Sequence, residues 1–205
     1  MLTLGATLLM LQAVPAGQLV RREIVFDARA TVEDFQGHVT DATGEQSGGA
    51  DLAAARGWVE VPWRAIDTRN GTRNRHMLKT VDEARYPVIR FDLAEVVADT
   101  AVGHGLAVRL RGTLALHGMS RDVEWPAVVS TYPDSVTVDA GFPVDMREYG
   151  IKPPVRFVIA RMGAVVQVRV RLVFALQKRE AGNGKREASD TGADASPFPL
   201  PPSRQ

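Results

Sequence analysis

The residue types that most often perform chemistry are sparse in this chain and lie far apart. Cysteine is absent, which excludes thiol nucleophiles and zinc sites built on thiolates. The histidines do not form an H-x-x-x-H or H-E-x-x-H pattern, which would place two imidazoles on one face of a helix. They are His38, His76, His104 and His117. We therefore predict no metal site.

The sequence motifs of common catalytic sites are also missing. No G-x-S-x-G segment occurs that would form the strained turn of a serine hydrolase, and no glycine-rich phosphate loop occurs either. Asp122 and Glu124 alternate with Val123 and Trp125, so on a strand both carboxylates face solvent and form no acid–base pair. We predict that the protein is not an enzyme and has no catalytic residues.

Basic residues gather in one segment of the chain. They are Arg69, Arg73, Arg75, His76, Lys79, Arg85 and Arg90. Acidic residues interrupt this cluster, no aromatic side chains on which bases could stack are interleaved with it, and the whole chain has a net charge of only +1. We predict no nucleic-acid partner. The cluster suits either a single anionic head group or a solvated helix face.

The elements that must position these side chains are mostly strands. Apolar and polar residues alternate along the chain, so that Val168 and Val170 face one way while Arg169 and Arg171 face the other. Strands are expected near residues 24–33, 57–63, 88–97, 106–117, 122–131, 136–145 and 166–176. A helix is expected over residues 73–84, where Met77 and Val81 share one face.

Long strands with one apolar face and no crossover helices predict an all-β protein of about eight antiparallel strands, as a sandwich or a closed barrel. Gly112 lies inside a long strand, where a curled sheet often bends. The interior of such a barrel is apolar, and it is either filled by its own side chains or holds one small ligand. The alternation alone leaves both interiors open.

The two ends of the chain differ from its middle. Hydrophobic residues make up 45% of the 205 residues, which predicts one globular domain. Residues 1–16 have a short uncharged apolar run that ends in Val-Pro-Ala, typical of a secretory signal peptide cleaved after Ala16, although a first strand is the alternative. Residues 178–205 are poor in bulky apolar side chains and predict a disordered tail. Its proline-rich end is either inert or docks as a polyproline II segment.

Five segments, taken together and in order, resemble the YceI-like family of extracytoplasmic lipid-binding proteins. They are Asp34-Phe35-Gln36-Gly37, Ile66-Asp67-Thr68 with Arg73-Asn74-Arg75-His76-Met77, Tyr86-Pro87-Val88-Ile89-Arg90-Phe91, Leu110-Arg111-Gly112-Thr113-Leu114-Ala115-Leu116-His117-Gly118-Met119, and Tyr149-Gly150-Ile151-Lys152-Pro153-Pro154. The resemblance departs at Asn74, where the family commonly has aspartate, so a salt bridge is not expected there.

The resemblance implies an eight-stranded, lipocalin-like antiparallel barrel over residues 17–177, with the helix at its mouth. It also implies a periplasmic or secreted protein that holds a polyisoprenoid, a fatty acid or a fatty amide in its lumen, without a further cofactor. The residues then expected to line the lumen are Phe26, Val61, Ile89, Phe91, Leu93, Val108, Leu110, Leu114, Phe142, Val168, Val170, Phe174 and, from the helix, Met77. The polar head is expected to meet Arg73, Arg75 and His76.

Two alternatives stay open at this point. A filled barrel would act as a scaffold or partner-binding module of the cell envelope. An enzyme acting on lipids would need a polar, pKa-shifted group that points inward, and the alternation offers none. A homodimer through an exposed edge or wall is compatible with the sequence but is not specified by it.

Overall fold

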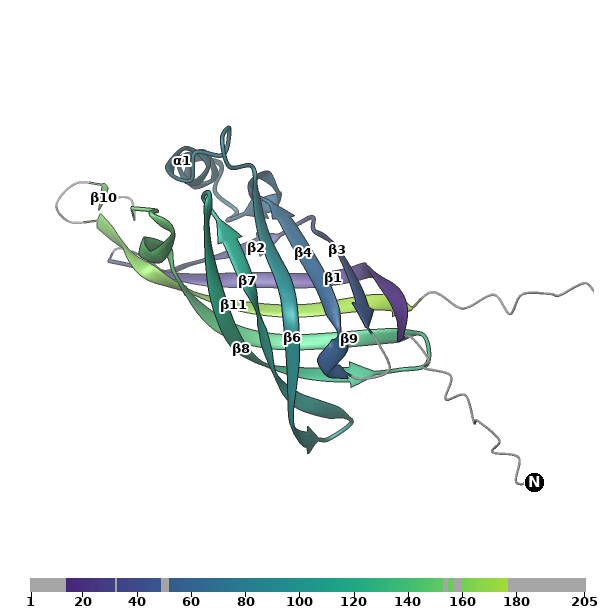
Figure 1. Ribbon diagram of the computed structural model, residues 1–205. Coiled ribbons are helices and arrows are strands. Elements are labelled where there is room, and N and C mark those ends of the chain that lie inside the picture. The colour runs from purple at the N-terminus through teal and green to yellow at the C-terminus, as the bar shows by residue number, and fades with distance from the viewer. Residues whose placement is uncertain (1–13, 32, 49–51, 153–154, 157–159, 177–205) are drawn as a thin grey trace, which may run out of the picture.

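The computed structural model describes residues 14–31, 33–48, 52–152, 155–156 and 160–176. Strands dominate this part of the chain (Figure 1). Its helical segments are α1 (Gly71–Thr80) and three short 3-10 helices, η1 (Leu52–Ala54), η2 (Trp63–Ala65) and η3 (Met146–Tyr149). None of these helices is long and apolar enough to cross a membrane.

Eight strands form a closed antiparallel ring, which confirms the expected fold class. Neighbours around the ring follow the order β1, β3, β4, β6, β7, β8, β9, β11 and back to β1. The ring strands are β1 (Val14–Ala30), β3 (Thr43–Gly48), β4 (Arg56–Pro62), β6 (Val88–Val102), β7 (Gly105–Leu116), β8 (Met119–Thr131), β9 (Ser135–Asp145) and β11 (Ala160–Leu176). Three short strands lie outside the ring: β2 (Phe35–Val39), β5 (Ile66–Asp67) and β10 (Val155–Arg156).

The seam between the first and the last strand closes the barrel. The pairing of β1 with β11 runs from Gly17 opposite Leu176 to Ala30 opposite Met162, with two register shifts along it. The first residues of β1 and the last of β11 therefore lie together, at the end of the barrel opposite α1 (Figure 1). We call the two ends the α1 end and the η1 end.

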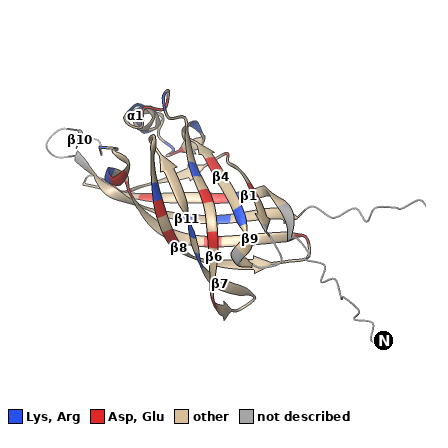
Figure 2. Ribbon diagram, in the orientation of Figure 1, with Lys and Arg blue, Asp and Glu red and all other residues tan. Residues whose placement is uncertain are grey.

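Charged residues occupy the outer face of the ring (Figure 2). Arg111 on β7 bridges Glu95 on β6 at 3.2 Å and Glu124 on β8 at 2.6 Å. Asp27 on β1 pairs with Arg169 on β11 at 2.8 Å, across the seam. These cross-strand pairs agree with the expected alternation, because each places its charges opposite the apolar face of the same strand.

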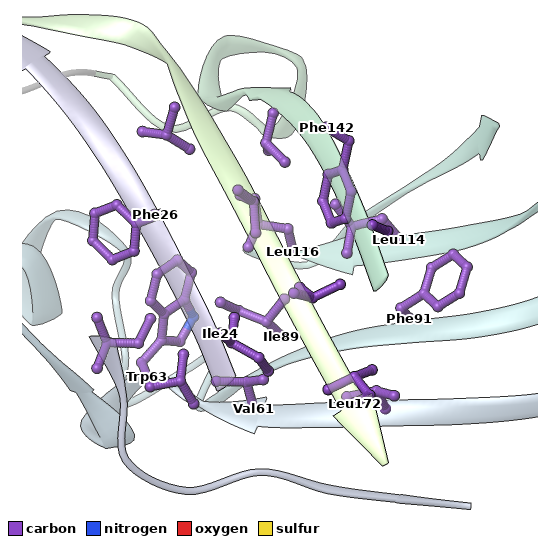
Figure 3. Close-up of a pocket in the computed structure, with 18 of the residues that line it drawn as sticks. Ile24, Phe26, Val61, Trp63, Ile89, Phe91, Leu114, Leu116, Phe142 and Leu172 are labelled. Atoms are coloured by element: carbon purple, nitrogen blue, oxygen red, sulfur yellow. The ribbon is translucent and has the colours of Figure 1, made fainter. Parts of the chain in front are cut away.

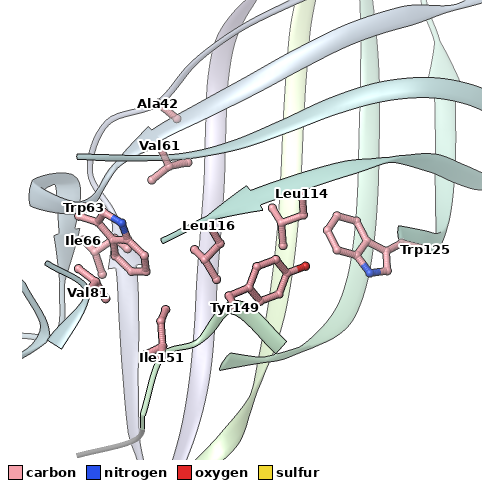
Figure 4. Close-up of a cluster of buried hydrophobic side chains, with 10 residues drawn as sticks. All are labelled: Ala42, Val61, Trp63, Ile66, Val81, Leu114, Leu116, Trp125, Tyr149 and Ile151. Carbon is pink, nitrogen blue, oxygen red and sulfur yellow. The ribbon is translucent and has the colours of Figure 1, made fainter. Parts of the chain in front are cut away.

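Buried side chains inside the ring form two clusters. The larger cluster lies toward the α1 end (Figure 4). Its members are Ala42, Val61, Trp63, Ile66, Val81, Leu114, Leu116, Trp125, Tyr149 and Ile151. The smaller cluster lies toward the η1 end and consists of Val96, Val108, Leu110, Ala127 and Val129.

Gly112 has the role that its place in a strand predicted. A β-carbon there would lie 2.3 Å from the Asp92 carbonyl oxygen and 2.8 Å from the Phe91 ring on the neighbouring strand. The register between β6 and β7 shifts beside this position. The absent side chain thus lets the Phe91 ring lie across the strand where the barrel wall bends.

The main differences from the sequence predictions concern β1, β3 and α1. β1 begins at Val14, so the predicted cleavage site after Ala16 falls inside this strand; residues 1–13 and the predicted tail, 178–205, lie outside the described residues. β3 was not predicted. The helix starts at Gly71 and ends at Thr80, because Asn70 caps the Arg73 amide and Asp82 adopts a left-handed φ of 48°.

Candidate ligand-binding cavity

The ring encloses an apolar cavity of about 910 Å³. This volume is near the upper end of the range of roughly 300–1,000 Å³ common for small-molecule sites. All eight ring strands contribute inward-facing side chains to its wall, several of which are drawn in Figure 3. The interior is therefore not filled by its own side chains.

The cavity is long. On β11 its wall includes alternate residues from Val166 to Phe174, and it continues to Met162 at the α1 end. Twelve residue steps from Met162 to Phe174, at about 3.3 Å per step, correspond to about 40 Å along the strand. An extended chain molecule fits this shape better than a compact one does.

Aromatic rings from three strands meet on the cavity wall. The Trp125 ring on β8 stacks on Phe142 of β9, with centroids 3.6 Å apart and planes inclined by 7°. The Phe91 ring on β6 also packs on Trp125, with centroids 5.2 Å apart and planes inclined by 30°. Such packed rings present a broad apolar surface with few rotatable bonds, which suits a ligand with many carbon atoms.

Helix α1 is held over one end of the cavity by a small hydrogen-bond network. Asn74 Oδ1 accepts bonds from the Thr68 amide at 3.0 Å and the Thr68 hydroxyl at 2.7 Å, and Thr68 is only 5% exposed. Asn74 Nδ2 donates to Asp67 Oδ1 at 2.9 Å. This bond, with a second from the Arg69 amide, lowers the pKa of Asp67 below its usual value. The Asn74 amide can accept hydrogen bonds from Thr68 and donate one to Asp67 at the same time, whereas a carboxylate could only accept.

The α1 end of the cavity is polar at its rim. Thr72, His76 and Thr80 of α1 lie on the wall. Arg73 is also on the wall, with its guanidinium carbon 4.0 Å from the centroid of the Phe35 ring, a cation–π contact. The apolar interior thus opens toward donors and a positive charge at this end.

The segment around η3 covers the other side of the same end. His117 Nδ1 donates to the Tyr149 carbonyl oxygen at 3.0 Å, and Arg121 Nε donates to the Glu148 carbonyl at 3.2 Å. Tyr149 is 2% exposed, and burial raises the pKa of its phenol. These contacts hold the η3 segment in place, with Ile151 on the cavity wall. The role of His117 here is therefore to fix this segment over the end of the barrel.

Most residues expected at the lumen lie on the cavity wall. These are Phe26, Val61, Met77, Ile89, Phe91, Leu93, Leu110, Leu114, Phe142, Val168, Val170 and Phe174. Val108 is the exception: it is 2% exposed within the smaller buried cluster, where Ala127 and Val129 fill the space around it. That a ligand contacts these side chains remains a prediction.

Of the three residues expected to meet a polar head group, two lie on the cavity wall and one does not. Arg73 and His76 lie on the wall, whereas Arg75 is exposed, donates from Nη2 to the Thr72 hydroxyl at 3.1 Å and is not part of the wall. Sequence reasoning did not single out Trp63 or Trp125 as wall residues. For Trp125 the signal was available, because it alternates in phase with Ala127 and Val129 on β8.

No group of three or more His, Asp or Glu side chains that could hold a metal ion occurs within the described part of the chain. The carboxylates on the cavity wall belong to Glu33 and Glu45, and both residues are exposed. The arrangement can enclose an apolar chain and present a polar rim to its end.

Comparison with known proteins identifies the family. The family model for the YceI-like domain matches residues 18–177, which is most of the chain and contains the whole cavity wall. No curated protein matches the sequence.

Solved structures share the fold at low identity. Burkholderia cenocepacia BcnA is 16% identical with a TM-score of 0.63, and the match covers 74% of this chain and 95% of that one. A polyisoprenoid binding domain from Saccharophagus degradans is 14% identical with a TM-score of 0.62, covering 80% of this chain and 99% of that one. The Campylobacter jejuni YceI protein is 12% identical with a TM-score of 0.57, covering 72% and 88%. With its eight-stranded ring and the matched residues 18–177, this chain belongs to the YceI-like domain family.

Proposed function

We propose that the protein is a non-catalytic binding protein that holds one long-chain amphiphile in the barrel lumen. The observation that carries this proposal is the apolar cavity that extends for about 40 Å along β11 inside a closed ring. Each buried methylene contributes about 0.8 kcal/mol, so a long chain gains affinity along the whole wall.

The ligand class follows from the length of the cavity and from its relatives. A polyisoprenoid is the first candidate, because the Saccharophagus degradans domain of the same fold is a polyisoprenoid binding domain. A fatty acid or fatty amide is the second. The hydrocarbon chain of either ligand would lie toward η1. The polar end of the ligand would lie beside α1, where Arg73 and His76 line the wall. Export to the periplasm or the exterior is part of the proposal and rests on the sequence of residues 1–16.

The direct test is native mass spectrometry of the purified protein, followed by organic extraction and mass analysis of the extract. The proposal expects one long-chain amphiphile per chain. Protein that carries no lipid and takes up no added polyprenyl or fatty-acyl compound would contradict it and favour a scaffold without a lumen ligand.

Two neighbouring positions on β11 provide a matched pair of variants. Val168 faces the cavity, whereas Gln167 is exposed on the outer face. Val168→Trp is expected to remove most of the lipid, because the new ring occupies the lumen. Gln167→Trp is expected to retain it. Equal lipid content in the two variants would contradict a lumen site.

A further inference from the structure

The segment that carries α1 concentrates the positive charge of the chain. Residues 69–81 contain four Lys and Arg residues and no Asp or Glu. The whole chain has a net charge of only +1, so all other residues together are net negative. Arg69, Arg75 and Lys79 are exposed, whereas Arg73 is half-buried on the cavity wall. We call the three exposed residues the basic face.

Acidic neighbours compensate this charge only in part. Asp67 lies near Arg69, which contributes to the lowered pKa of the carboxyl. Glu83, beyond the end of α1, is held by Arg64 at 3.0 Å. Asp82 is the remaining carboxylate of residues 64–85, and it lies after the helix.

The two basic residues on the helix itself point the same way. Arg75 and Lys79 are four residues apart and therefore neighbours on one side of α1. Within the described residues, neither forms an ion pair, and Arg75 bonds only to the Thr72 hydroxyl. Both cations are thus available to an anionic partner.

The basic face lies beside an opening of the apolar cavity. Thr72, His76 and Thr80 of the same helix form the rim of the cavity at this end. No residue of α1 is fully buried, so the helix presents a broad surface to its surroundings. Exposed Glu33 and Asp34 follow β1 at this end and confine the positive surface to the α1 side.

We propose that the basic face docks the protein on a bilayer surface that contains anionic phospholipids, with the α1 end of the cavity beside the bilayer. Each basic side chain near such a surface strengthens attachment about fivefold, so three give about a hundredfold preference over a neutral bilayer. Attachment of this strength is reversible. The inference goes beyond the proposed function, which concerns the lumen alone.

A bilayer fits this surface better than a nucleic acid does. Residues 69–81 contain no Phe, Tyr or Trp on which bases could stack. The opening beside the basic face leads into an apolar interior, and long-chain lipids reside in bilayers. Docking at this end would shorten the path of such a lipid through water.

The test is flotation of the full-length protein with two kinds of vesicle, one of phosphatidylcholine alone and one with about 30% phosphatidylglycerol. Wild type should bind only the anionic vesicles at low salt and should dissociate in about 0.3 M NaCl, because salt screens exposed charges. The double variant Arg69→Gln, Arg75→Gln should bind about tenfold more weakly or less. Neither residue lies on the cavity wall.

The matched control is Arg21→Gln, Arg109→Gln, which removes the same charge from the outer wall at β1 and β7. Its vesicle binding should stay within about twofold of wild type. An equal loss in both double variants would show that net charge alone matters and would overturn the basic face. Full binding by Arg69→Gln, Arg75→Gln, or equal binding of wild type to both kinds of vesicle, would also overturn it.

A second readout separates this inference from the proposed function. Loading of a fluorescent polyprenol from anionic vesicles should be slower in Arg69→Gln, Arg75→Gln, whereas affinity for the same polyprenol dispersed without vesicles should match wild type. Equal loading rates would contradict docking and leave the lumen site standing. Failure of wild type to take up any lipid would instead contradict the proposed function and leave the vesicle result standing.

Discussion

At the scale of single residues, two arginines near the start of α1 differ in their relation to the cavity although they are only two residues apart. Arg73 lies on the cavity wall over Phe35, whereas Arg75 bonds to Thr72 on the exposed side. Of these two arginines, only Arg73 is placed to meet a ligand that extends out of the lumen, and it shares the wall with His76 and Lys79. An arginine is suited to this because its planar fork matches a phosphate.

Arg73→Ala is therefore expected to weaken a phosphorylated polyprenol about tenfold or more, and the corresponding alcohol much less, since only the phosphate forms a charge-assisted bond. Arg75→Ala is the matched control, with little expected change for either lipid. The measurement is competition binding with both lipids. An equal loss of the two lipids in Arg73→Ala would show that this residue does not recognise a head group.

The sequence was sufficient to identify wall residues wherever they alternate within a long strand, as at Val168 and Val170. It was not sufficient for Val108, since alternation shows that a side chain points inward but not whether space remains there. It also missed Trp63, because this residue lies in a 3-10 turn where the period of two has ended.

At the scale of elements, the position of α1 depends on the side-chain amide of Asn74, which bonds to the Thr68 hydroxyl and to the Asp67 carboxylate. Asn74→Asp would replace the donor that serves Asp67 with a second carboxylate. We expect a lower stability at pH 7, because two like charges would meet at this contact.

The stability difference between Asn74→Asp and the wild type should depend on pH, and the direction follows from the lowered pKa of Asp67. Asp67 has a lowered pKa in the folded protein, so it stabilises the wild type above the unfolded value of 3.8, and this stability is lost as pH falls through the folded pKa. In Asn74→Asp the two carboxylates raise the pKa of the pair. The deficit in urea midpoint relative to wild type should therefore be largest at pH 7 and shrink toward pH 4.

The control for this prediction exchanges the two side chains. The double variant Asp67→Asn, Asn74→Asp restores one amide and one carboxylate, and it should recover most of the stability at pH 7. A deficit that does not change with pH, or that the exchange does not recover, would mean that Asn74 acts only through its bonds to Thr68.

The elements themselves were predictable in proportion to their apolar periodicity. β7, β9 and the main part of β11 were found close to their observed bounds. β3 was missed because its sequence, Thr-Gly-Glu-Gln-Ser-Gly, has no apolar residue, and it is a strand only because β1 and β4 pair with it on either side. Its place in the ring is thus fixed by tertiary pairing.

At the scale of the whole molecule, a lumen ligand should stabilise the fold. A lipid that binds the folded barrel but not the unfolded chain adds about 2.7 kcal/mol at a hundredfold excess over its dissociation constant. For a domain of this size, this corresponds to a rise in melting temperature of about 5–10 °C. Organic extraction and refolding should lower the melting temperature by that amount, and re-addition of the extracted lipid should restore it.

The measurement is thermal unfolding followed by circular dichroism, with the protein before extraction, after extraction and after re-addition. Val168→Trp serves as the control, because its occupied lumen should make its melting temperature insensitive to added lipid. An unchanged melting temperature in wild type after verified removal of lipid would contradict stabilisation from the lumen.

Closure of the whole barrel was predicted correctly from the resemblance to the YceI-like family, but it did not follow from the alternation of residues. Alternation in separate strands predicts a sandwich as readily as a barrel, and the difference is made by the seam between β1 and β11, whose partners are about 150 residues apart in sequence. The cavity was harder to predict than the closure of the barrel. It exists because the summed volume of the inward side chains of all eight strands is too small to fill the lumen, and the alternation within one strand does not reveal that sum.

One feature of the wall gives the protein a built-in optical signal. Two of the three tryptophans of the chain, Trp63 and Trp125, are buried on the cavity wall, whereas Trp58 lies on the outer face of β4, where Arg90 packs over its ring. Indole emission shifts in wavelength when water near the ring is exchanged for hydrocarbon. Two of the three indoles therefore sense the lumen, and the intrinsic fluorescence of this protein reports filling and emptying of the barrel without any attached label.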